Sequence, residues 1–229
     1  MSALFLIAAN LVPLVGALAG SWTAGSVIFL FWFECLIVGA FTVVKLLAYG
    51  VLKELPPDYP MDPWAIRVGR VIGMACWSAF FVVHFGFFCL LPSGIVVGIS
   101  GLSNRGHPPW EVPRFALEVL QGDLRYAVVP LLISHAISFV LDFLVHREYK
   151  RMDYLNLTIV PYLRVAPVWL ALLPGIILFV LFESPLVFLL LLTAAKIGAD
   201  LKLHLLERKT GLAGLFGIGR NRGKGSTPR

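Results

Sequence analysis

The chain has 229 residues, of which 59% are hydrophobic and only 14% are charged, and its mean hydropathy is +0.85. Soluble domains contain about 45–50% apolar and about 25% charged residues, so this composition excludes an ordinary soluble domain and indicates a membrane protein. The formal net charge of +6 does not indicate nucleic-acid binding, because the basic residues gather beside apolar segments and in the C-terminal tail, where topology signals lie.

Apolar segments occur about six times along the chain, each near the roughly 20 residues that a membrane-spanning helix requires. The expected spans are Ala3–Gly20, Thr23–Tyr49, Ile66–Leu91, Leu124–Val145, Ile159–Phe182 and Pro185–Leu206. The first lacks the positive n-region and the cleavage pattern of a signal peptide, so we expect it to be retained. The sequence therefore predicts an all-α, polytopic membrane helix bundle of about six transmembrane helices, formed by residues 1–208 as one domain.

The segments between and after the spans carry their own signals. The Pro-rich break from Lys53 to Pro60 cannot be helical membrane core, because proline removes a donor and restricts the preceding residue. Beyond Pro92 the apolar character continues, so the third span is either kinked or followed by a re-entrant piece. Residues Pro113–Gly122 are predicted to form a short amphipathic interfacial helix between spans three and four. Residues 209–229 form a basic, Gly-rich tail, which we expect to be disordered and cytoplasmic.

The basic residues beside the spans predict the orientation of the chain. With six spans, one side of the membrane receives six of them, Lys53, Arg67, Arg70, Arg147, Lys150 and Arg151, and six more between Arg208 and Arg229, which makes twelve. The other side receives three, Arg105, Arg114 and Arg125. Because loops rich in lysine and arginine stay in the cytoplasm, both termini are expected there, in a multi-pass protein of the cell inner (cytoplasmic) membrane.

Charged and polar residues lie inside the apolar segments, where each charge costs about 2.5–3.5 kcal/mol on insertion scales. Residues eleven apart on an α-helix differ by only about 20° and share a face. Three pairs have this spacing: Glu34 with Lys45, His135 with His146, and Lys196 with Glu207. We therefore expect a polar intramembrane core, made of Glu34, Lys45, His84, His135, Arg164, Lys196 and Glu207.

Two Asp-x3-His pairs indicate a more specific arrangement. Asp142 with His146 and Asp200 with His204 each have i, i+4 spacing, which points both side chains the same way. Both spans run toward the cytoplasm, so the four residues can form a site for a divalent transition metal such as zinc, with Glu207 either as a further ligand or as a hydrogen-bond partner of a ligand. The alternative is an ion-pair network in which lysine and arginine neutralise the carboxylates.

The remaining candidate residues have structural interpretations. His84, nearer the outer face, is expected to form a hydrogen bond between helices rather than to bind haem. Cys35, Cys76 and Cys89 all lie in apolar runs without a CxxC motif, which favours packing over disulfides or metal binding. The known hydrolase, nucleotide-binding and zinc-protease motifs are missing from the sequence, so no catalytic residue is assigned.

Several short motifs resemble one family. They are Asn10–Gly16, Phe31–Glu34 with Gly39 and Lys45, Phe81 with His84–Gly86, Ser134–His135, Ser138–Phe139, Glu148–Tyr149, Pro161–Tyr162 with Arg164, and Lys196 with Asp200–Leu201, His204 and Glu207. Together they are similar to domain-of-unknown-function family 6498, multi-pass membrane proteins of prokaryotes. The resemblance implies a membrane fold and no assigned activity. This chain has Pro92 and Trp169 where the family tends to have histidines, which weakens a multi-histidine metal or haem site.

Three functions fit these observations. The first is a binding or translocation protein whose polar interior handles a small solute, an ion or protons, with a homodimer supplying a second half. The second is a metal-dependent membrane enzyme that works at the cytoplasmic face through Asp142, His146, Asp200 and His204. The third is an accessory subunit of a membrane complex whose charges serve docking to a partner.

Overall fold

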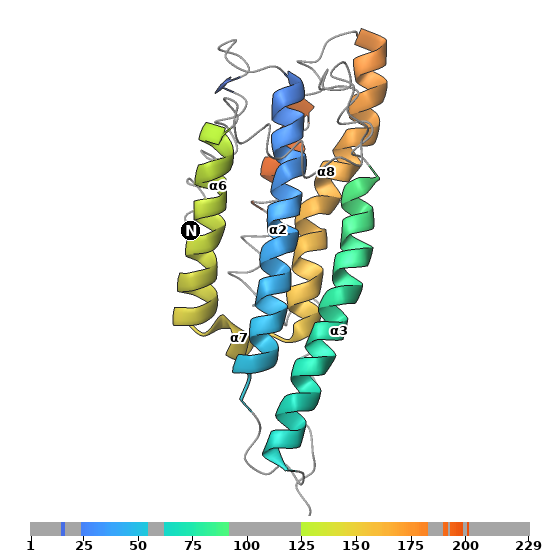
Figure 1. Ribbon diagram of the computed structural model, residues 1–229. Helices are drawn as coiled ribbons and strands as arrows, with labels where there is room; N and C mark the ends of the chain where they lie inside the picture. Colours follow the sequence, from blue (N-terminus) through green and yellow to red (C-terminus); the bar gives the residue numbers. More distant parts are fainter. Residues whose placement is uncertain are drawn as a thin grey trace, which may run out of the picture.

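The computed structural model describes residues 15–16, 24–54, 62–91, 125–182, 190–191, 193–198 and 201, and every secondary-structure element in these ranges is helical (Figure 1). In chain order the elements are α2 (Ala24–Leu52), α3 (Pro63–Leu90), α6 (Arg125–Ser138), the π-helix η2 (Phe139–Val145), the short α7 (Glu148–Arg151) and α8 (Tyr154–Phe182). Residues 193–198 are also helical. The described part of the chain is therefore all-α, as the composition predicts.

Three helical segments are long and apolar enough to cross a membrane: Phe29–Leu52, Pro63–Leu90 and Arg125–Val145. They match the second, third and fourth predicted spans to within a few residues. Helix α8 contains the fifth, ends at the same residue and begins five residues earlier, at Tyr154. The first predicted span, the interfacial helix at 113–122, the tail at 209–229 and most of the sixth span lie outside the described residues. The count of six spans and the position of the termini remain predictions.

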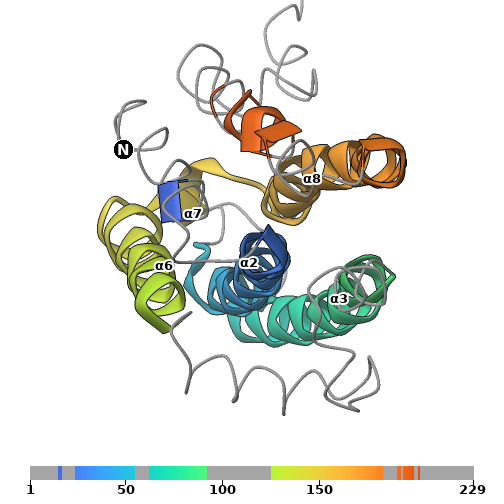
Figure 2. The same ribbon diagram turned by 90° about the horizontal axis from the view of Figure 1, so that it is seen from above.

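Helix α2 lies at the centre of the bundle and packs against α3, α6 and α8 (Figure 2). Because it has neighbours on several sides, its buried side chains are spread around the helix. They include Phe29, Phe31, Trp32, Ile37, Leu46 and Tyr49. A helix that is apolar all round is expected either in the core of a large protein or inside a membrane. The central position of α2 explains why its apolar residues are not confined to one face.

Helix α3 is apolar all round but buries only one stripe. Its buried residues are Ser78, Phe81, Phe85 and Cys89, at intervals of three and four residues. The opposite faces expose large apolar side chains, including Val83 at 73% and Phe87 at 57%. Monomeric soluble proteins rarely expose a contiguous apolar surface of this kind, which marks contact with a membrane or with a partner protein. The contrast between the buried stripe and the exposed faces supports a helix that contacts lipid.

Close approach and buried hydrogen bonds hold α2, α3 and α8 together. A Cβ atom built on Gly39 would lie 2.7 Å from the Phe85 ring, so only glycine permits this contact between α2 and α3. The Trp32 indole donates to the Cys89 carbonyl at 2.7 Å, and the Trp77 indole donates to the Thr158 hydroxyl at 2.8 Å. Small residues and hydrogen bonds between helices are the usual means of helix association in lipid.

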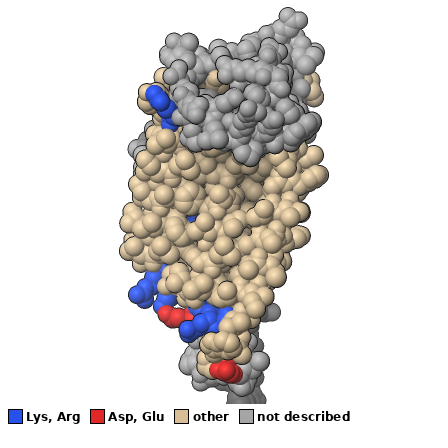
Figure 3. Space-filling model, viewed as in Figure 1, with Lys and Arg blue, Asp and Glu red and all other residues tan. Residues whose placement is uncertain are grey.

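The charged surface is confined to the ends of the bundle. Figure 3 shows a band with almost no charged side chains across the middle of the visible face, with lysine, arginine and carboxylate side chains gathered at the end where α2 stops and α3 starts. A separate basic group lies at the opposite end, where α6 begins at Arg125. This distribution agrees with the asymmetry of basic residues that the sequence predicts for a membrane-spanning bundle.

Candidate functional site

An ion pair joins α2 to the helical segment 193–198. The Lys196 ammonium donates a hydrogen bond to Oε1 of Glu34 at 3.1 Å, and the two side chains are 6% and 23% exposed. The same ammonium lies 5.7 Å from the centre of the Phe31 ring, in a cation–π contact. A carboxylate and an aromatic face are the usual partners of a desolvated cation.

The position of this pair follows from the sequence of α2. Glu34 lies four residues from the middle of the helix Ala24–Leu52, which is about 6 Å along the axis. Phe31 precedes it by three residues and therefore lies on the same face. A carboxylate near the middle of a span has no access to water by simple extension of its side chain, so it requires a partner within the bundle. Lys196 is that partner, as the ion-pair interpretation of the sequence proposed.

Lys45 and His135 lie nearer the end of the bundle where α2 stops and α3 starts, which we call the basic end. Both side chains contact aromatic rings. The Lys45 ammonium is 5.6 Å from the centre of the Phe143 ring of η2. The His135 ring stacks on Phe41 of α2 at 5.9 Å, and both histidine and phenylalanine are partly buried. These contacts join α6 and η2 to α2.

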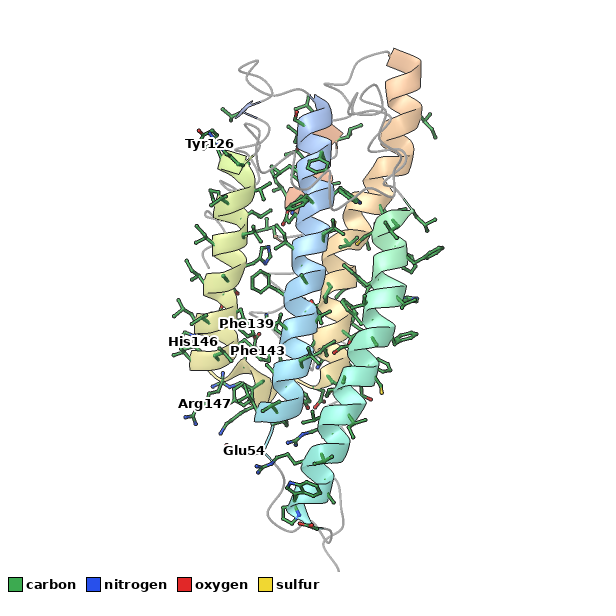
Figure 4. The ribbon with its side chains drawn as sticks, in the orientation of Figure 1. Glu54, Tyr126, Phe139, Phe143, His146 and Arg147 are labelled. Atoms are coloured by element: carbon green, nitrogen blue, oxygen red, sulfur yellow. The ribbon has the colours of Figure 1, made fainter. Side chains whose placement is uncertain are left out.

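His146 lies on a different face from the one that its eleven-residue spacing from His135 predicts, and Asp142 lies beside it. The Asp142 and His146 side chains are 54% and 71% exposed, with His146 Nδ1 3.7 Å from Asp142 Oδ1, and the Ser138 hydroxyl donates to Asp142 Oδ2 at 2.8 Å. Figure 4 shows His146 on the outer side of the helix, whereas Phe139 and Phe143 point toward α2. The proposed common face of His135 and His146 is therefore wrong.

The cause of this difference is the π-helix. The backbone N–H of His146 bonds to the carbonyl of Leu141, five residues earlier, at 2.8 Å. A π-helical hydrogen bond encloses one residue more than an α-helical one, so the faces of the helix shift relative to the regular spacing. The shift lets Phe139 and Phe143 stack on each other at 5.6 Å and face the core. Arg147, with φ of 52°, then ends the helix.

The four-residue metal site is only half described. Asp142 and His146 are adjacent, as the i, i+4 spacing predicts, but Asp200 and His204, together with Glu207, lie outside the described residues. Among the residues that the structure does describe, no group of three or more histidine, cysteine, aspartate or glutamate side chains is suited to hold a metal ion. Two of the four proposed ligands lie among the described residues, and the metal site remains a prediction.

His84 makes the hydrogen bond between helices that the sequence analysis expects. Its Nδ1 lies 2.7 Å from the hydroxyl of Tyr162, which links α3 to α8. Arg164, the remaining member of the predicted polar core, lies two residues further along α8. The sequence analysis did not identify Tyr162 as the partner of His84. Its position next to Arg164 in an otherwise apolar segment was the available signal.

A second polar cluster, at the basic end, was missed. The Lys53 ammonium donates to the carbonyls of Tyr149, Lys150 and Met152 at 3.2, 3.0 and 3.2 Å. Carbonyls in the last turn of a helix have no intrahelical donor, so this lysine caps α7. Lys150 also pairs with Glu54 at 2.7 Å, and this hydrogen bond lowers the pKa of the Glu54 carboxyl. The sequence analysis assigned Lys53 and Lys150 only to topology.

Comparison with known proteins identifies one related family. The model of a family of unknown function, DUF6498, matches residues 1–213, which is nearly the whole chain. No curated protein and no solved structure gave a match. The match extends over all the residues of the ion pair, the π-helix and the two clusters described above. It confirms the resemblance drawn from the short motifs and assigns no activity.

Proposed function

We propose that this chain, which belongs to the family of unknown function DUF6498, is a multi-pass protein of the cell inner membrane that binds or translocates a small ion, a small solute or protons. The observation that carries the proposal is the Glu34–Lys196 ion pair, in which Lys196 is only 5% exposed. Charged residues inside a membrane bundle are expensive and mark pathways for ions, protons or charged substrates.

The membrane assignment rests on the apolar helices. Three of them have sufficient length and hydropathy to cross a bilayer, and α3 exposes most of its apolar surface. We extend this to six spans with both termini in the cytoplasm, on the evidence of the apolar segments and the basic residues in the full sequence. Lipid is then the medium that covers the uncharged band of Figure 3.

The pair provides a simple way to exchange charge. Protonation of Glu34 removes the negative partner of Lys196 and leaves an ammonium in a medium of low dielectric constant. That ammonium then attracts a small anion or releases its own proton. The buried hydroxyl of Thr193, one turn before Lys196, has no hydrogen-bond partner among the described residues and offers a further polar group on the same segment. A second copy of the chain is the proposed source of the other half of a pathway.

Proton movement is the most direct test. Purified protein is reconstituted into vesicles that contain a pH-sensitive dye, and proton entry is driven by a potassium diffusion potential. Faster acidification than in protein-free vesicles is expected from the wild type, with loss of most of the increase in Glu34→Gln. Glu54→Gln is the matched control, because it makes the same chemical change in an exposed carboxylate outside the spans. Equal rates in wild-type, Glu34→Gln and protein-free vesicles contradict proton translocation.

A metal-dependent enzyme at the cytoplasmic face is the second candidate. The adjacent Asp142 and His146 side chains at the basic end of η2 favour it, with Asp200 and His204 completing an O2N2 ligand set for zinc. Metal content of the detergent-purified protein tests this function. It predicts one bound transition metal per chain, which is lost in the Asp200→Ala, His204→Ala double variant. Metal-free wild-type protein purified without chelators contradicts it.

A further inference from the structure

A cluster of aromatic side chains surrounds His84 on the exposed side of α3 and α8. Phe80 stacks on the His84 ring at 5.5 Å with an interplanar angle of 18°, and Phe88 lies at 5.1 Å on the other side. Tyr162 approaches from α8 at 5.6 Å. Trp169, seven residues along α8, contacts Phe88 at 6.4 Å. The imidazole therefore lies among aromatic rings from two helices.

This cluster is open to the surroundings of the bundle. His84 is exposed, and Phe80 and Phe88 are 54% and 39% exposed. His84 lies six residues before the end of α3 at Leu90, which is about 9 Å along the axis and about 11 Å from the helix midpoint. The hydrocarbon core of a bilayer extends about 15 Å on each side of its centre. Phe85, the neighbour of His84, packs against Gly39, close to the middle of α2, so the exposed edge of the imidazole lies within the hydrocarbon.

The second ring nitrogen of His84, Nε2, needs a hydrogen-bond partner within the hydrocarbon. Nδ1 is used by the Tyr162 hydroxyl at 2.7 Å, and no hydrogen bond to Nε2 occurs among the described residues. An unsatisfied polar group costs several kcal/mol in hydrocarbon, which contains no water to replace the missing partner. The medium must therefore supply a molecule that is soluble in lipid and carries a hydrogen-bonding group.

We propose that the aromatic cluster formed by Phe80, His84, Phe88, Tyr162 and Trp169 is a lipid-facing binding site for a quinone of the isoprenoid class. A quinone ring is apolar and planar, so it suits contact with aromatic faces, and its carbonyl oxygen accepts a hydrogen bond from Nε2 of His84. A neighbouring transmembrane helix is a poorer occupant, because its backbone carbonyls are already bonded within the helix.

The His84–Tyr162 pair accommodates both redox states of such a ligand. When the tyrosine hydroxyl donates to Nδ1, the proton of the neutral imidazole is on Nε2, which then donates to a quinone carbonyl. When Nδ1 carries the proton and donates to the tyrosine oxygen, Nε2 accepts from the hydroxyl of a quinol. The site lies between α3 and α8, whereas the Glu34–Lys196 pair joins α2 to residues 193–198. The quinone site therefore does not depend on the function proposed for that pair.

Quenching of tryptophan fluorescence by a short-chain ubiquinone analogue tests the site in nanodiscs, since Trp169 is part of the cluster. Saturable quenching is expected for the wild type and for Ile72→Phe, a control that introduces the same aromatic ring at an exposed position of α3 outside the cluster. His84→Phe keeps the aromatic ring but removes the nitrogen, so the apparent affinity is expected to fall about tenfold, the equivalent of one hydrogen bond. Tyr162→Phe is expected to weaken binding to a smaller extent.

A ligand-side control makes the test independent of the folding of any variant. A naphthalene that carries the same alkyl tail but no oxygen atoms is titrated into wild-type protein, and it is expected to quench only in proportion to its partition into lipid. Equal saturable quenching by the naphthalene and the quinone overturns the proposal, because the hydrogen bond to His84 then contributes nothing. Linear quenching by the quinone in wild-type nanodiscs overturns it as well, since no site is then being filled.

Discussion

Two lysine–glutamate pairs, one inside the bundle and one beyond the end of α2 at Leu52, show how the environment changes the role of an ion pair. Glu34 and Lys196 form a pair with 23% and 6% exposed side chains near the middle of a span. Glu54 and Lys150 form a shorter contact, 2.7 Å, with side chains that are 74% and 33% exposed. Distance alone would make the second pair the stronger one. Solvent reverses that order, because water screens the exposed charges and competes for their hydrogen bonds.

The buried pair and the exposed pair also differ in what replaces a lost partner. At the basic end, water solvates a lysine whose carboxylate has been removed. In the bundle interior nothing does, so the remaining charge must move, neutralise or bind an ion. This difference is the physical reason why the buried pair is proposed to handle charge, whereas the exposed pair and the Lys53 cap are assigned to the structure of the end of the bundle where α2 stops.

Removal of one member of the buried pair is expected to have the largest effect. Glu34→Ala leaves the Lys196 ammonium buried without its carboxylate, and breaking a buried pair in this way costs about 3–5 kcal/mol. The thermal unfolding temperature in detergent should fall by far more than in Glu54→Ala, which removes the carboxylate of the exposed pair. Equal small shifts in the two variants would show that Glu34 is not desolvated in the folded protein.

The Lys53 cap is expected to have an intermediate effect. Lys53→Met removes three charge-assisted hydrogen bonds to the carbonyls of Tyr149, Lys150 and Met152. Hydrogen bonds to charged groups contribute about 1.5–3 kcal/mol to stability, and here the carbonyls retain partial access to water. The measurement is the same unfolding temperature, with Arg67→Met as a control for loss of an exposed positive charge. A loss no greater than that of the control contradicts the capping role.

The exposed Glu54–Lys150 pair is expected to have the smallest effect, and one that depends on pH. Lys150 lowers the pKa of Glu54 from its ordinary value of 4.5. A lowered pKa in the folded state means that the contribution to stability is complete above 4.5 and disappears as the pH falls through the folded pKa. The small difference in unfolding temperature between wild type and Glu54→Gln should therefore vanish in acid and shrink in high salt. A difference that grows in acid would contradict the pairing.

Much of this fold follows from hydropathy and a few local signals. The predicted spans at Thr23–Tyr49, Ile66–Leu91 and Leu124–Val145 correspond to α2, α3 and α6 with η2. Asp62 and Pro63 mark the start of α3 in the usual way, with the Asp62 side chain accepting from the Trp64 N–H at 3.1 Å. These features can be predicted from the sequence because they depend only on neighbouring residues and on the mean hydropathy of each segment.

The candidate site was predicted in part. Glu34 and Lys196 were recognised as costly charges in spans, and charge complementarity made each a natural partner for the other. The π-helix Phe139–Val145 was not predictable from periodicity, because it is stabilised by tertiary contacts of Phe139 and Phe143 with α2. Predictions that assumed regular α-helical spacing across this segment fail, and the clearest case is the helix face predicted for His146. The Lys53 cap required knowledge of the turn that follows Arg147.

A double-mutant cycle measures the central claim, that Glu34 and Lys196 stabilise each other as a desolvated pair. The four proteins are wild type, Glu34→Met, Lys196→Met and the double variant, compared by their unfolding temperatures and free energies in the same detergent. The account predicts that each single variant is strongly destabilised and that the double variant is more stable than either, because no buried charge is left alone. Additive losses, with the double variant the least stable of the four, would contradict it.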